Sequence, residues 1–343
     1  MRAVQMTAER APLELRETTA REPAAGEVRV HIRAAGICHS DAHYRGGLSA
    51  MGPLPLTLGH EIAGVIERIG PGVTALALGE RVCLHYLLTC GTCAHCAAGR
   101  EAFCVSGVML GHHVDGGFAE CITVPARNAV KLPERIPFEH GAVLMCSSAT
   151  ALHALRRGRL NPGESVAVFG CGGLGVSAVQ LARVLGAREV FAVDIAADKL
   201  ALARKLGAHA IDAGSGDAVA AIRAATGGRG ADVTLDLVGM PATMQSAVRV
   251  LAPQGRAVLV GLSRARLKLD PYREILAPEA ELIGSNDHTL GELQELIALV
   301  EQGQLDLSHA VTATVPLDAG AINDTLDALE QGRAGVRTVV VTS

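Results

Sequence analysis

Residues 165–194 read SVAVFGCGGLGVSAVQLARVLGAREVFAVD, and this stretch decides the fold of the second half of the chain. Ser165–Gly170 has the short apolar pattern of a buried strand, Leu174–Leu185 repeats apolar residues at helical spacing, and Glu189–Asp194 is a second strand pattern. The first strand leads into Gly170-Cys-Gly172-Gly-Leu-Gly175, a G-x-G-x-x-G sequence that opens the helix. Glycines at these positions permit a tight turn and let the backbone approach a pyrophosphate at the helix N-terminus. The stretch therefore predicts a strand–helix–strand unit that binds a dinucleotide.

The acid that ends the second strand indicates which dinucleotide. Asp194 lies 19 residues after Gly175, where a carboxylate accepts hydrogen bonds from the ribose hydroxyls of NAD and repels the 2′-phosphate of NADP. Arg188 and Lys199 are close by and argue in the opposite direction. A glycine-rich turn with an aspartate that caps the next helix is the structural alternative. The full order of strand, loop, helix, strand and acid favours NAD binding.

The pattern of alternating strands and helices continues beyond this unit. Asp232–Val238 and Arg256–Gly261 have strand patterns, and Ala242–Leu251 between them has a helical one. Such alternation predicts right-handed βαβ units, a parallel sheet and a doubly wound α/β domain. The segment from Met1 to about Cys146 instead has short Val/Ile runs between glycines and prolines, such as Glu27–Ile32, and is predicted to be mostly β. The helical patterns and closing strand after about residue 286 are compatible with two placements, as a cap on the α/β domain or as a return to the first domain.

Composition excludes several classes of function. The chain has 343 residues, enough for two domains, with a net charge of -4, five Phe, three Tyr and no Trp. It therefore lacks the basic field and the aromatic platforms of a nucleic-acid-binding surface. The charged N-terminus does not resemble a signal peptide, and no apolar run reaches the ~20 residues of a membrane span. We expect a cytoplasmic protein, in which nine cysteines favour metal binding or catalysis over disulfides.

Four of the cysteines are regularly spaced in one short loop. Cys90, Cys93, Cys96 and Cys104 form a C-x2-C-x2-C-x7-C pattern. Four thiolates make a closed tetrahedral set, which is typical of structural zinc and leaves no position for a reacting water. Disulfides or buried free thiols are the alternatives, and His95 is a further ligand-type residue within the loop. The regular spacing favours a structural zinc held by the four thiolates.

Two further clusters predict a second metal. They are Cys38-His39-Ser40-Asp41-Ala-His43 and Gly59-His60-Glu61, and Cys146 lies farther along the chain. Cys38, His60 and Cys146 together supply two thiolates and one imidazole, which is the three-ligand set of a catalytic zinc with one open position. Cys146 is the weakest of these assignments, because it follows an apolar run where a buried cysteine is ordinary.

Taken together, these motifs resemble those of the zinc-containing medium-chain alcohol dehydrogenases of the bacterial type, over essentially the full chain. The resemblance implies a Rossmann domain at 151–286 and a mostly β, GroES-like catalytic domain at 1–150 and 287–343, with the active site in the cleft between them. It implies that Cys38, His60 and Cys146 bind the catalytic zinc. Glu61 would approach the metal during ligand exchange, and Ser40 would accept the substrate proton and pass it to His43.

The resemblance also implies roles for residues behind the zinc ligands and around the cofactor. Asp41 would orient the histidine ligand, His39 and Arg337 would contact the cofactor pyrophosphate, and Thr150 would line the nicotinamide pocket. The expected cofactor-binding residues are His39, Thr150, Gly170, Gly172, Gly173, Leu174, Gly175, Asp194, Lys199, Val238 and Arg337. The expected chemistry is hydride transfer between an alcohol and NAD, in which zinc acts as a Lewis acid and a hydroxyl–histidine chain removes the proton.

The expected substrate is an apolar or aryl, primary or secondary alcohol, oxidised to an aldehyde or ketone. This expectation depends on Tyr86 and the aliphatic residues Leu48, Met109 and Leu110 as pocket walls. The alternatives are a polyol, amino-alcohol or threonine dehydrogenase on the same scaffold, and a nucleotide-binding protein that has lost catalysis. The three zinc ligands argue against the second alternative and against a zinc-free quinone reductase. We expect a homo-oligomer, a tetramer rather than a dimer, with neither nucleic acid nor membrane as a partner.

The remaining cysteines and histidines receive no metal. Cys83, Cys121 and Cys171 are expected to be small core or loop residues. His112 and His113 are ligand-like, but both predicted metal sites are complete without them. His85, beside Tyr86, has no role that the sequence indicates.

Overall fold

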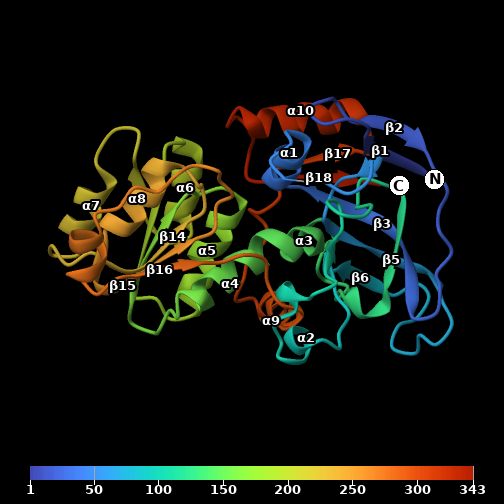
Figure 1. The fold of residues 1–343 in the computed structure, drawn as a ribbon, viewed down its shortest axis with the longest axis horizontal. Coiled ribbons are helices and arrows are strands. Elements are labelled where there is room, and N and C mark those ends of the chain that lie inside the picture. The colour runs from blue at the N-terminus through green and yellow to red at the C-terminus, as the bar shows by residue number, and fades with distance from the viewer. Residues whose placement is uncertain (50, 343) are drawn as a thin grey trace. The chain divides into compact units, whose positions relative to one another are not determined.

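The computed structural model describes residues 1–49 and 51–342. Ala50, and Ser343 at the end of the predicted catalytic domain, lie outside the described residues. The chain divides into two compact units, Met1–Cys146 with Thr289–Ser343, and Ser147–His288 (Figure 1). The predicted limits at 150/151 and 286/287 differ from these by four and two residues. Across the described ranges, no helix combines the length and the apolar character needed to cross a membrane.

The Ser147–His288 unit is built on a parallel sheet with the strand order β13-β12-β11-β14-β15-β16. The order reverses at the central strand β11, so right-handed crossovers carry successive helices to opposite faces of the sheet. The predicted doubly wound parallel sheet is confirmed. Its elements are α4 (Ala149–Arg157), β11 (Ser165–Phe169), α5 (Gly173–Val184), β12 (Glu189–Asp194), α6 (Ala197–Lys205), β13 (His209–Asp212), α7 (Ala218–Ala225), β14 (Ala231–Asp236), α8 (Pro241–Arg249), β15 (Leu251–Leu259), a π-helical turn (Pro271–Leu276) and β16 (Glu281–Gly284).

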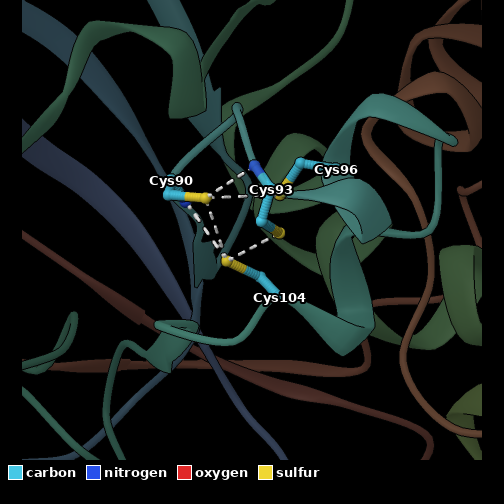
Figure 2. Close-up of side chains that lie close together, drawn as sticks. All are labelled: Cys90, Cys93, Cys96 and Cys104. Carbon is cyan, nitrogen blue, oxygen red and sulfur yellow. Dashed lines mark hydrogen bonds between the residues drawn. The ribbon is translucent and has the colours of Figure 1, made fainter.

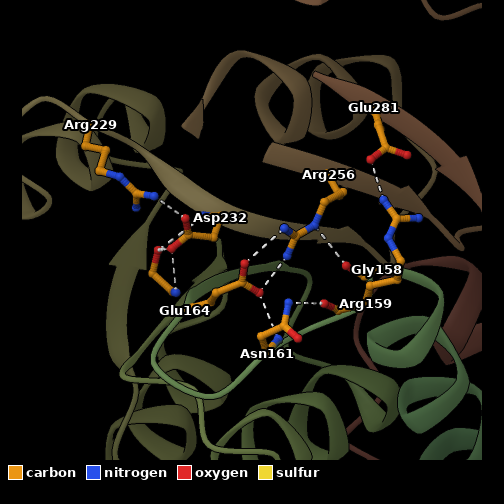
Figure 3. Close-up of polar contacts among 9 residues, drawn as sticks. Gly158, Arg159, Asn161, Glu164, Arg229, Asp232, Arg256 and Glu281 are labelled. Carbon is orange, nitrogen blue, oxygen red and sulfur yellow. Dashed lines mark hydrogen bonds and ion pairs between the residues drawn. The ribbon is translucent and has the colours of Figure 1, made fainter. Parts of the chain in front are cut away.

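Ion pairs and hydrogen bonds join the N-terminal ends of the neighbouring strands in this sheet (Figure 3). Glu164, just before β11, pairs with both terminal nitrogens of Arg256 on β15, at 3.0 and 2.6 Å. Asp232 on β14 accepts hydrogen bonds from the backbone N–H and the hydroxyl of Ser165, both at 2.8 Å, and pairs with Arg229. These contacts lie at the N-terminal ends of the strands. The glycine loop lies at the opposite ends, because it begins at the C-terminal end of β11.

The other unit is mostly β, as the sequence predicts. Its largest sheet has the order β10-β6-β5-β3-β18-β17, and β9 also pairs with β3. Smaller sheets join β2-β1-β4 and β7-β8. The strands are β1 (Arg2–Met6), β2 (Glu14–Glu17), β3 (Glu27–Ile37), β4 (Leu56–Thr57), β5 (Glu61–Ile69), β6 (Arg81–Leu84), β7 (Leu87–Leu88), β8 (Val108–Met109), β9 (Cys121–Pro125), β10 (Ala129–Lys131), β17 (Ala313–Pro316) and β18 (Thr338–Val341).

The long strand β3 organises this unit and leads to the site. It pairs antiparallel with β5 on one side and with the C-terminal strand β18 on the other, so the C-terminal segment completes a sheet begun by residues 27–37. An apolar core lies against these strands and includes Val30, Ile62 and Val340. The helical elements of the unit are α1 (His39–Arg45), α2 (Ala94–Ala97), α3 (Phe138–Val143), α9 (Leu290–Glu301), α10 (Ala319–Glu330), the 3-10 turns Glu101–Phe103 and Ala126–Asn128, and a π-helical turn Leu144–Ser148 that runs across the unit boundary.

Candidate metal and cofactor sites

Four residues from three segments meet at the end of β3. Cys38 follows β3 directly, His60 precedes β5 and Glu61 begins it, and Cys146 lies in the π-helical turn. All four are buried, and one ligand atom from each lies within 4.8 Å of the others. A π-helical turn inserts one extra residue into a helix and often occurs at functional sites. The residues predicted as catalytic zinc ligands are therefore brought together, with Glu61 beside them.

Asp41 connects two of the segments that carry these ligands. Its fully buried carboxylate accepts a hydrogen bond from the backbone N–H of Cys38 at 2.8 Å and from that of Gly59 at 3.2 Å. It also lies 3.3 Å from Nδ1 of His60. A carboxylate accepts here, so Nδ1 carries the hydrogen and Nε2 keeps its lone pair for a metal.

Glu61, one of the four clustered residues, forms an ion pair with Arg337. The closest oxygen and nitrogen are 3.2 Å apart, and both side chains are buried. Gly36, opposite Glu61 in the β3–β5 ladder, makes room for the carboxylate, because a Cβ there would lie 1.9 Å from Glu61 Oε2. Arg337 also donates a hydrogen bond to the carbonyl of Ile37 at 3.1 Å. The C-terminal segment thereby supplies a buried cation next to the cluster, and the predicted pyrophosphate contact of Arg337 stays a prediction.

Burial and neighbouring charges shift the pKa values of these groups. Burial raises the pKa of Glu61 to about 8, and the Arg337 charge opposes this shift. The hydrogen bond with Cys146 lowers the pKa of Cys38 well below its usual range, and it raises that of Cys146. One thiolate is thus favoured even without a bound ion, and thiolate is the form of cysteine that binds metal.

The donor set fits zinc. Two cysteine sulfurs and one imidazole nitrogen, buried and within reach of one another, are the protein ligands of a catalytic zinc that keeps a fourth position open. The carboxylate behind the histidine is the partner that such a ligand normally has. Cys38, His60 and Cys146 would hold the ion, and Asp41 would orient the imidazole.

The four-cysteine loop forms a second cluster (Figure 2). The sulfur–sulfur distances are 3.9 Å for Cys90–Cys96, 4.0 Å for Cys93–Cys104 and 3.6 Å for Cys90–Cys104. Four sulfurs at the Zn–S bond length of ~2.3 Å lie about 3.8 Å apart at the corners of a tetrahedron. Backbone N–H groups of Thr92 and Cys93 donate to Cys90 and lower its pKa to about 5. The loop fits a closed structural zinc site.

The residues of the predicted proton path lie on α1. The hydroxyl of Ser40 is 3.7 Å from the sulfur of Cys38. One turn later, the ring of His43 lies 4.7 Å from that of His39. Burial lowers the pKa of His43, and the nearby His39 adds to this effect. Ser40 thus lies beside a predicted zinc ligand, and the part of Ser40 and His43 in proton transfer stays a prediction.

In the other unit, each glycine of the G-x-G-x-x-G loop has a distinct geometric reason. Gly170 has a φ of +97°, which side-chain-bearing residues rarely adopt. Gly172 precedes α5 and has open space where a Cβ would point, whereas a Cβ on Gly175 would lie 2.0 Å from the carbonyl oxygen of Gly170. Turn, ligand approach and close packing are the three requirements of a dinucleotide loop. The loop therefore fits a pyrophosphate at the N-terminus of α5.

Asp194 also holds the shape of this loop. Its carboxylate accepts backbone hydrogen bonds from Cys171 at 2.7 Å, Ile195 at 2.7 Å and Ala196 at 2.9 Å. The bonds to Ile195 and Ala196 at the start of the next helix agree with the structural alternative for Asp194, whereas the bond to Cys171 in the glycine loop was not predicted, and the ribose contact stays a prediction. The other predicted cofactor residues of this unit are Thr150, buried on α4, Gly173 and Leu174 at the start of α5, Lys199 on α6, and Val238, which is 39% exposed after β14. Their contacts with NAD stay predictions.

Residues outside the predicted ligand sets behave as follows. Cys83, Cys121 and Cys171 are buried free thiols. The ring of Tyr86 lies 5.3 Å from that of His60, and Leu110 belongs to the apolar core. Sequence reasoning missed the room made by Gly36, the Glu61–Arg337 pair and a hydrogen-bonded histidine pair that includes His112. The sequence signals among these were the glycine two residues before Cys38 and the adjacent, ligand-like His112 and His113.

Comparisons with known proteins agree with this organisation. A family model described as alcohol dehydrogenase GroES-like domain matches residues 24–134, and one described as zinc-binding dehydrogenase matches residues 173–302. The chain is 36% identical to an alcohol dehydrogenase of Geobacillus stearothermophilus, over 96% of each chain. It is 35% identical to an NAD-dependent alcohol dehydrogenase of Sulfurisphaera tokodaii, over 99% of this chain and 100% of that one.

Other comparisons extend to a different substrate and to solved structures. The chain is 32% identical to a 2-dehydro-3-deoxy-L-galactonate 5-dehydrogenase of Pseudoalteromonas atlantica, over 90% of this chain and 91% of that one. A crystal structure of an NAD-dependent alcohol dehydrogenase superposes with a TM-score of 0.93 at 31% identity, and each chain is covered completely. Both family models match in order, and the likeness runs over nearly the whole length; the chain therefore belongs to the zinc-containing medium-chain alcohol dehydrogenase family.

Proposed function

We propose that this protein is a zinc-dependent alcohol dehydrogenase that transfers hydride reversibly between an alcohol and NAD, giving an aldehyde or a ketone. The observation that carries the proposal is the buried cluster of Cys38, His60 and Cys146, whose three ligands leave one position for a substrate. A second zinc would be held by the four-cysteine loop, where a full set of thiolates leaves no open position.

Each group near the cluster has a task in this proposal. Zinc, when bound, supplies Lewis-acid polarisation of the substrate hydroxyl. Asp41 keeps His60 in the tautomer that can bind a metal, and the Glu61–Arg337 pair places a carboxylate beside the ligands. Ser40 takes the proton of the substrate hydroxyl, and His43 passes it outward.

The cofactor half of the proposal depends on the glycine loop and its surroundings. NAD, when bound, accepts the hydride at its nicotinamide. The open space at Gly172 and the carboxylate of Asp194 support binding of the pyrophosphate and the ribose of NAD. The proposed contacts are His39, Thr150, Gly170, Gly172, Gly173, Leu174, Gly175, Asp194, Lys199, Val238 and Arg337.

For the substrate, we propose an apolar or aryl, primary or secondary alcohol. Tyr86 beside His60, with the half-buried Leu48 and Met109, supports apolar walls. A polyol or another polar alcohol is the second candidate. The hydrogen-bonded pair of Ser49 and His112 near the cluster favours it, and one relative acts on a sugar acid. We further propose a homo-oligomer, a tetramer rather than a dimer, which the exposed Tyr272 and Leu276 support as contact residues.

The test combines metal content, cofactor binding and turnover. Cys38→Ser should lower bound zinc from two ions per chain to one and abolish NAD reduction by a panel of alcohols, because one of three ligands is lost. NADH binding, followed by fluorescence, should persist because the glycine loop is on the other unit. Cys83→Ser is the matched control, since Cys83 is also buried, belongs to neither metal-ligand cluster of the described residues, and donates from its sulfur to the Val130 carbonyl at 3.6 Å. Full activity of Cys38→Ser would contradict the zinc assignment.

A further inference from the structure

A chain of hydrogen bonds runs through two histidines that neither metal site uses. Ser49 Oγ lies 2.8 Å from Nε2 of His112, and Nδ1 of His112 lies 3.1 Å from Nε2 of His113. The backbone N–H of Met109 donates to Nδ1 of His113 at 3.0 Å. Ser49 follows α1, and both histidines follow β8, so this chain of hydrogen bonds joins two loops.

The direction of every hydrogen bond in this chain follows from its first donor. A backbone N–H can only donate, so Nδ1 of His113 accepts, and the hydrogen of this neutral ring is on Nε2. His113 then donates to Nδ1 of His112, which places the hydrogen of His112 on its own Nε2. His112 therefore donates to Ser49, whose oxygen accepts. The hydroxyl hydrogen of Ser49 is left to donate elsewhere.

This arrangement occupies the acceptor side of a hydroxyl and does not conduct protons. The hydrogen-bond chain starts at a peptide N–H, which does not give up its hydrogen, so no proton can be relayed from that end. Burial lowers the pKa of His112 to about 4, and His113 and His60 add to this effect, so the ring stays neutral at physiological pH. Ser49 thereby accepts from His112 and keeps its own hydroxyl hydrogen available as a neutral donor.

Aromatic contacts connect this chain of hydrogen bonds to the cluster of predicted zinc ligands. The ring of Tyr44 lies 4.5 Å from that of His112 and 6.4 Å from that of His60, between centroids. Tyr44 is one helical turn after Ser40 on α1, so both side chains lie on the same face of the helix. The ring of Tyr44 therefore lies between His60, a proposed zinc ligand, and His112, which belongs to the hydrogen-bond chain that ends at Ser49.

Backbone hydrogen bonds hold the segment around Ser49 on two sides. The N–H of Leu48 donates to the carbonyl of His43 at 2.9 Å, and that of Gly52 donates to the carbonyl of His112 at 2.8 Å. The first bond ties the segment to α1, which carries the proposed proton path. The second ties it to the loop that carries the histidines.

We propose that Ser49 contacts the substrate and recognises a second oxygen atom on it, and that His112 and His113 are positioning residues for this hydroxyl. The inference rests on the proposed alcohol dehydrogenase function and deepens it. It assigns as substrates alcohols that carry a further neutral oxygen acceptor (hydroxyl, ether or carbonyl) near the reacting carbon. A donor aimed at such an oxygen discriminates against the analogue that lacks it.

The test compares two isosteric alcohols in zinc-replete holoenzyme. The alcohols 1-methoxy-2-propanol and 2-pentanol differ only in an oxygen that replaces a methylene, and both are oxidised at a secondary carbon. A second pair, 2,3-butanediol and 2-butanol, tests a hydroxyl as the acceptor. The readout is kcat/KM of the oxygen-bearing alcohol divided by kcat/KM of its partner in the same pair, with NAD as the hydride acceptor. Ser49→Ala should lower this ratio on the order of tenfold in at least one pair, which is the effect of losing one neutral hydrogen bond.

Further variants separate positioning from structure. His112→Phe keeps a ring against Tyr44 but removes the donor to Ser49, so the ratio should fall, chiefly through KM of the oxygen-bearing alcohol. His112→Gln restores an N–H near the position of Nε2, and Ser49→Thr keeps the hydroxyl, so both should keep most of the ratio. Ser308→Ala makes the same change at an exposed serine of the same unit and is the matched control.

Two results would overturn the proposal while leaving the proposed function intact. One is a ratio for Ser49→Ala that stays within about twofold of the wild-type ratio in both pairs, which is smaller than one hydrogen bond. The other is wild-type turnover of 2-pentanol and 2-butanol without turnover of either oxygen-bearing partner. Failure of the proposed function is a different result, namely no NAD reduction with any of the four alcohols, and the proposal then fails with it.

Discussion

The buried carboxylate of Asp41 is the group whose alteration should disturb the catalytic metal most selectively. Both of its oxygens are acceptors: Oδ2 takes the N–H of Cys38, and Oδ1 takes the N–H of Gly59 and faces Nδ1 of His60. Asp41→Asn keeps the size of the side chain but replaces one oxygen with an NH2 group. In either orientation of the amide, this NH2 group faces at least one N–H that needs an acceptor.

The expected loss follows from that mismatch. A buried donor left without an acceptor costs about 1–3 kcal/mol, and the residue loses the charge that supports the His60 tautomer. We expect about 2 kcal/mol to appear as weaker zinc binding at the Cys38–His60–Cys146 cluster, which is roughly a 30-fold rise in Kd. Within the described residues Asp41 bonds to Cys38, Gly59 and His60 and not to the four-cysteine loop, so the zinc of that loop should remain bound.

Competition with a chromogenic chelator measures this Kd, with the four-cysteine zinc as an internal reference. Asp115→Asn is the matched control, because this exposed carboxylate accepts the N–H of Thr57 at 2.8 Å and an amide oxygen can take its place in that bond. A zinc affinity of Asp41→Asn within about threefold of wild type would refute the reasoning, because that change is smaller than the cost of one unmet donor. Asp41 would then be a helix-capping residue without influence on the metal.

Three further predictions concern space, cofactor choice and pH. Gly36→Ala should unfold the protein at a lower temperature and lower its activity, because the new Cβ would lie 1.9 Å from the buried Glu61 carboxylate; an unchanged melting curve would mean that Glu61 relocates freely. Asp194→Gly should raise kcat/KM with NADP relative to NAD and also lower Tm, because three backbone N–H groups lose their acceptor; a lower Tm with an unchanged preference would limit the carboxylate to shaping the turn. Burial acts to raise the pKa of Asp232, but hydrogen bonds with Arg229 and Ser165 outweigh this effect and lower the pKa from 3.8 to about 2. The ionised carboxylate therefore stabilises the folded protein above pH 3.8, and this contribution is lost as the pH falls through 2. The Tm difference between wild type and Asp232→Asn should therefore shrink across that window, and a constant difference would contradict the assigned pKa.

Local sequence patterns were enough to predict the central strands and helix of the Ser147–His288 unit. The strand Glu189–Asp194 has the predicted bounds, and α5 begins and ends within one residue of the predicted helix, because apolar periodicity is strong where an element is buried. The edge strands β13 and β16 were not predicted. Their residues are largely exposed or half-buried, so the apolar run that marks a strand is absent.

For the candidate sites, the sequence by itself determined which residue types are present and in what spacing. The four cysteines of the loop are close in sequence, so their spacing alone predicts a cluster, and the glycine loop is equally local. Cys38, His60 and Cys146 are far apart in the chain, and their meeting depends on how β3, β5 and a π-helical turn pack. Only the tertiary structure decided that Gly36 leaves room for Glu61 and that Arg337 pairs with it. Contacts of this kind, like the orientation of Ser49 by two histidines, depend on the relative positions of distant backbone segments, and a one-dimensional pattern does not contain those positions.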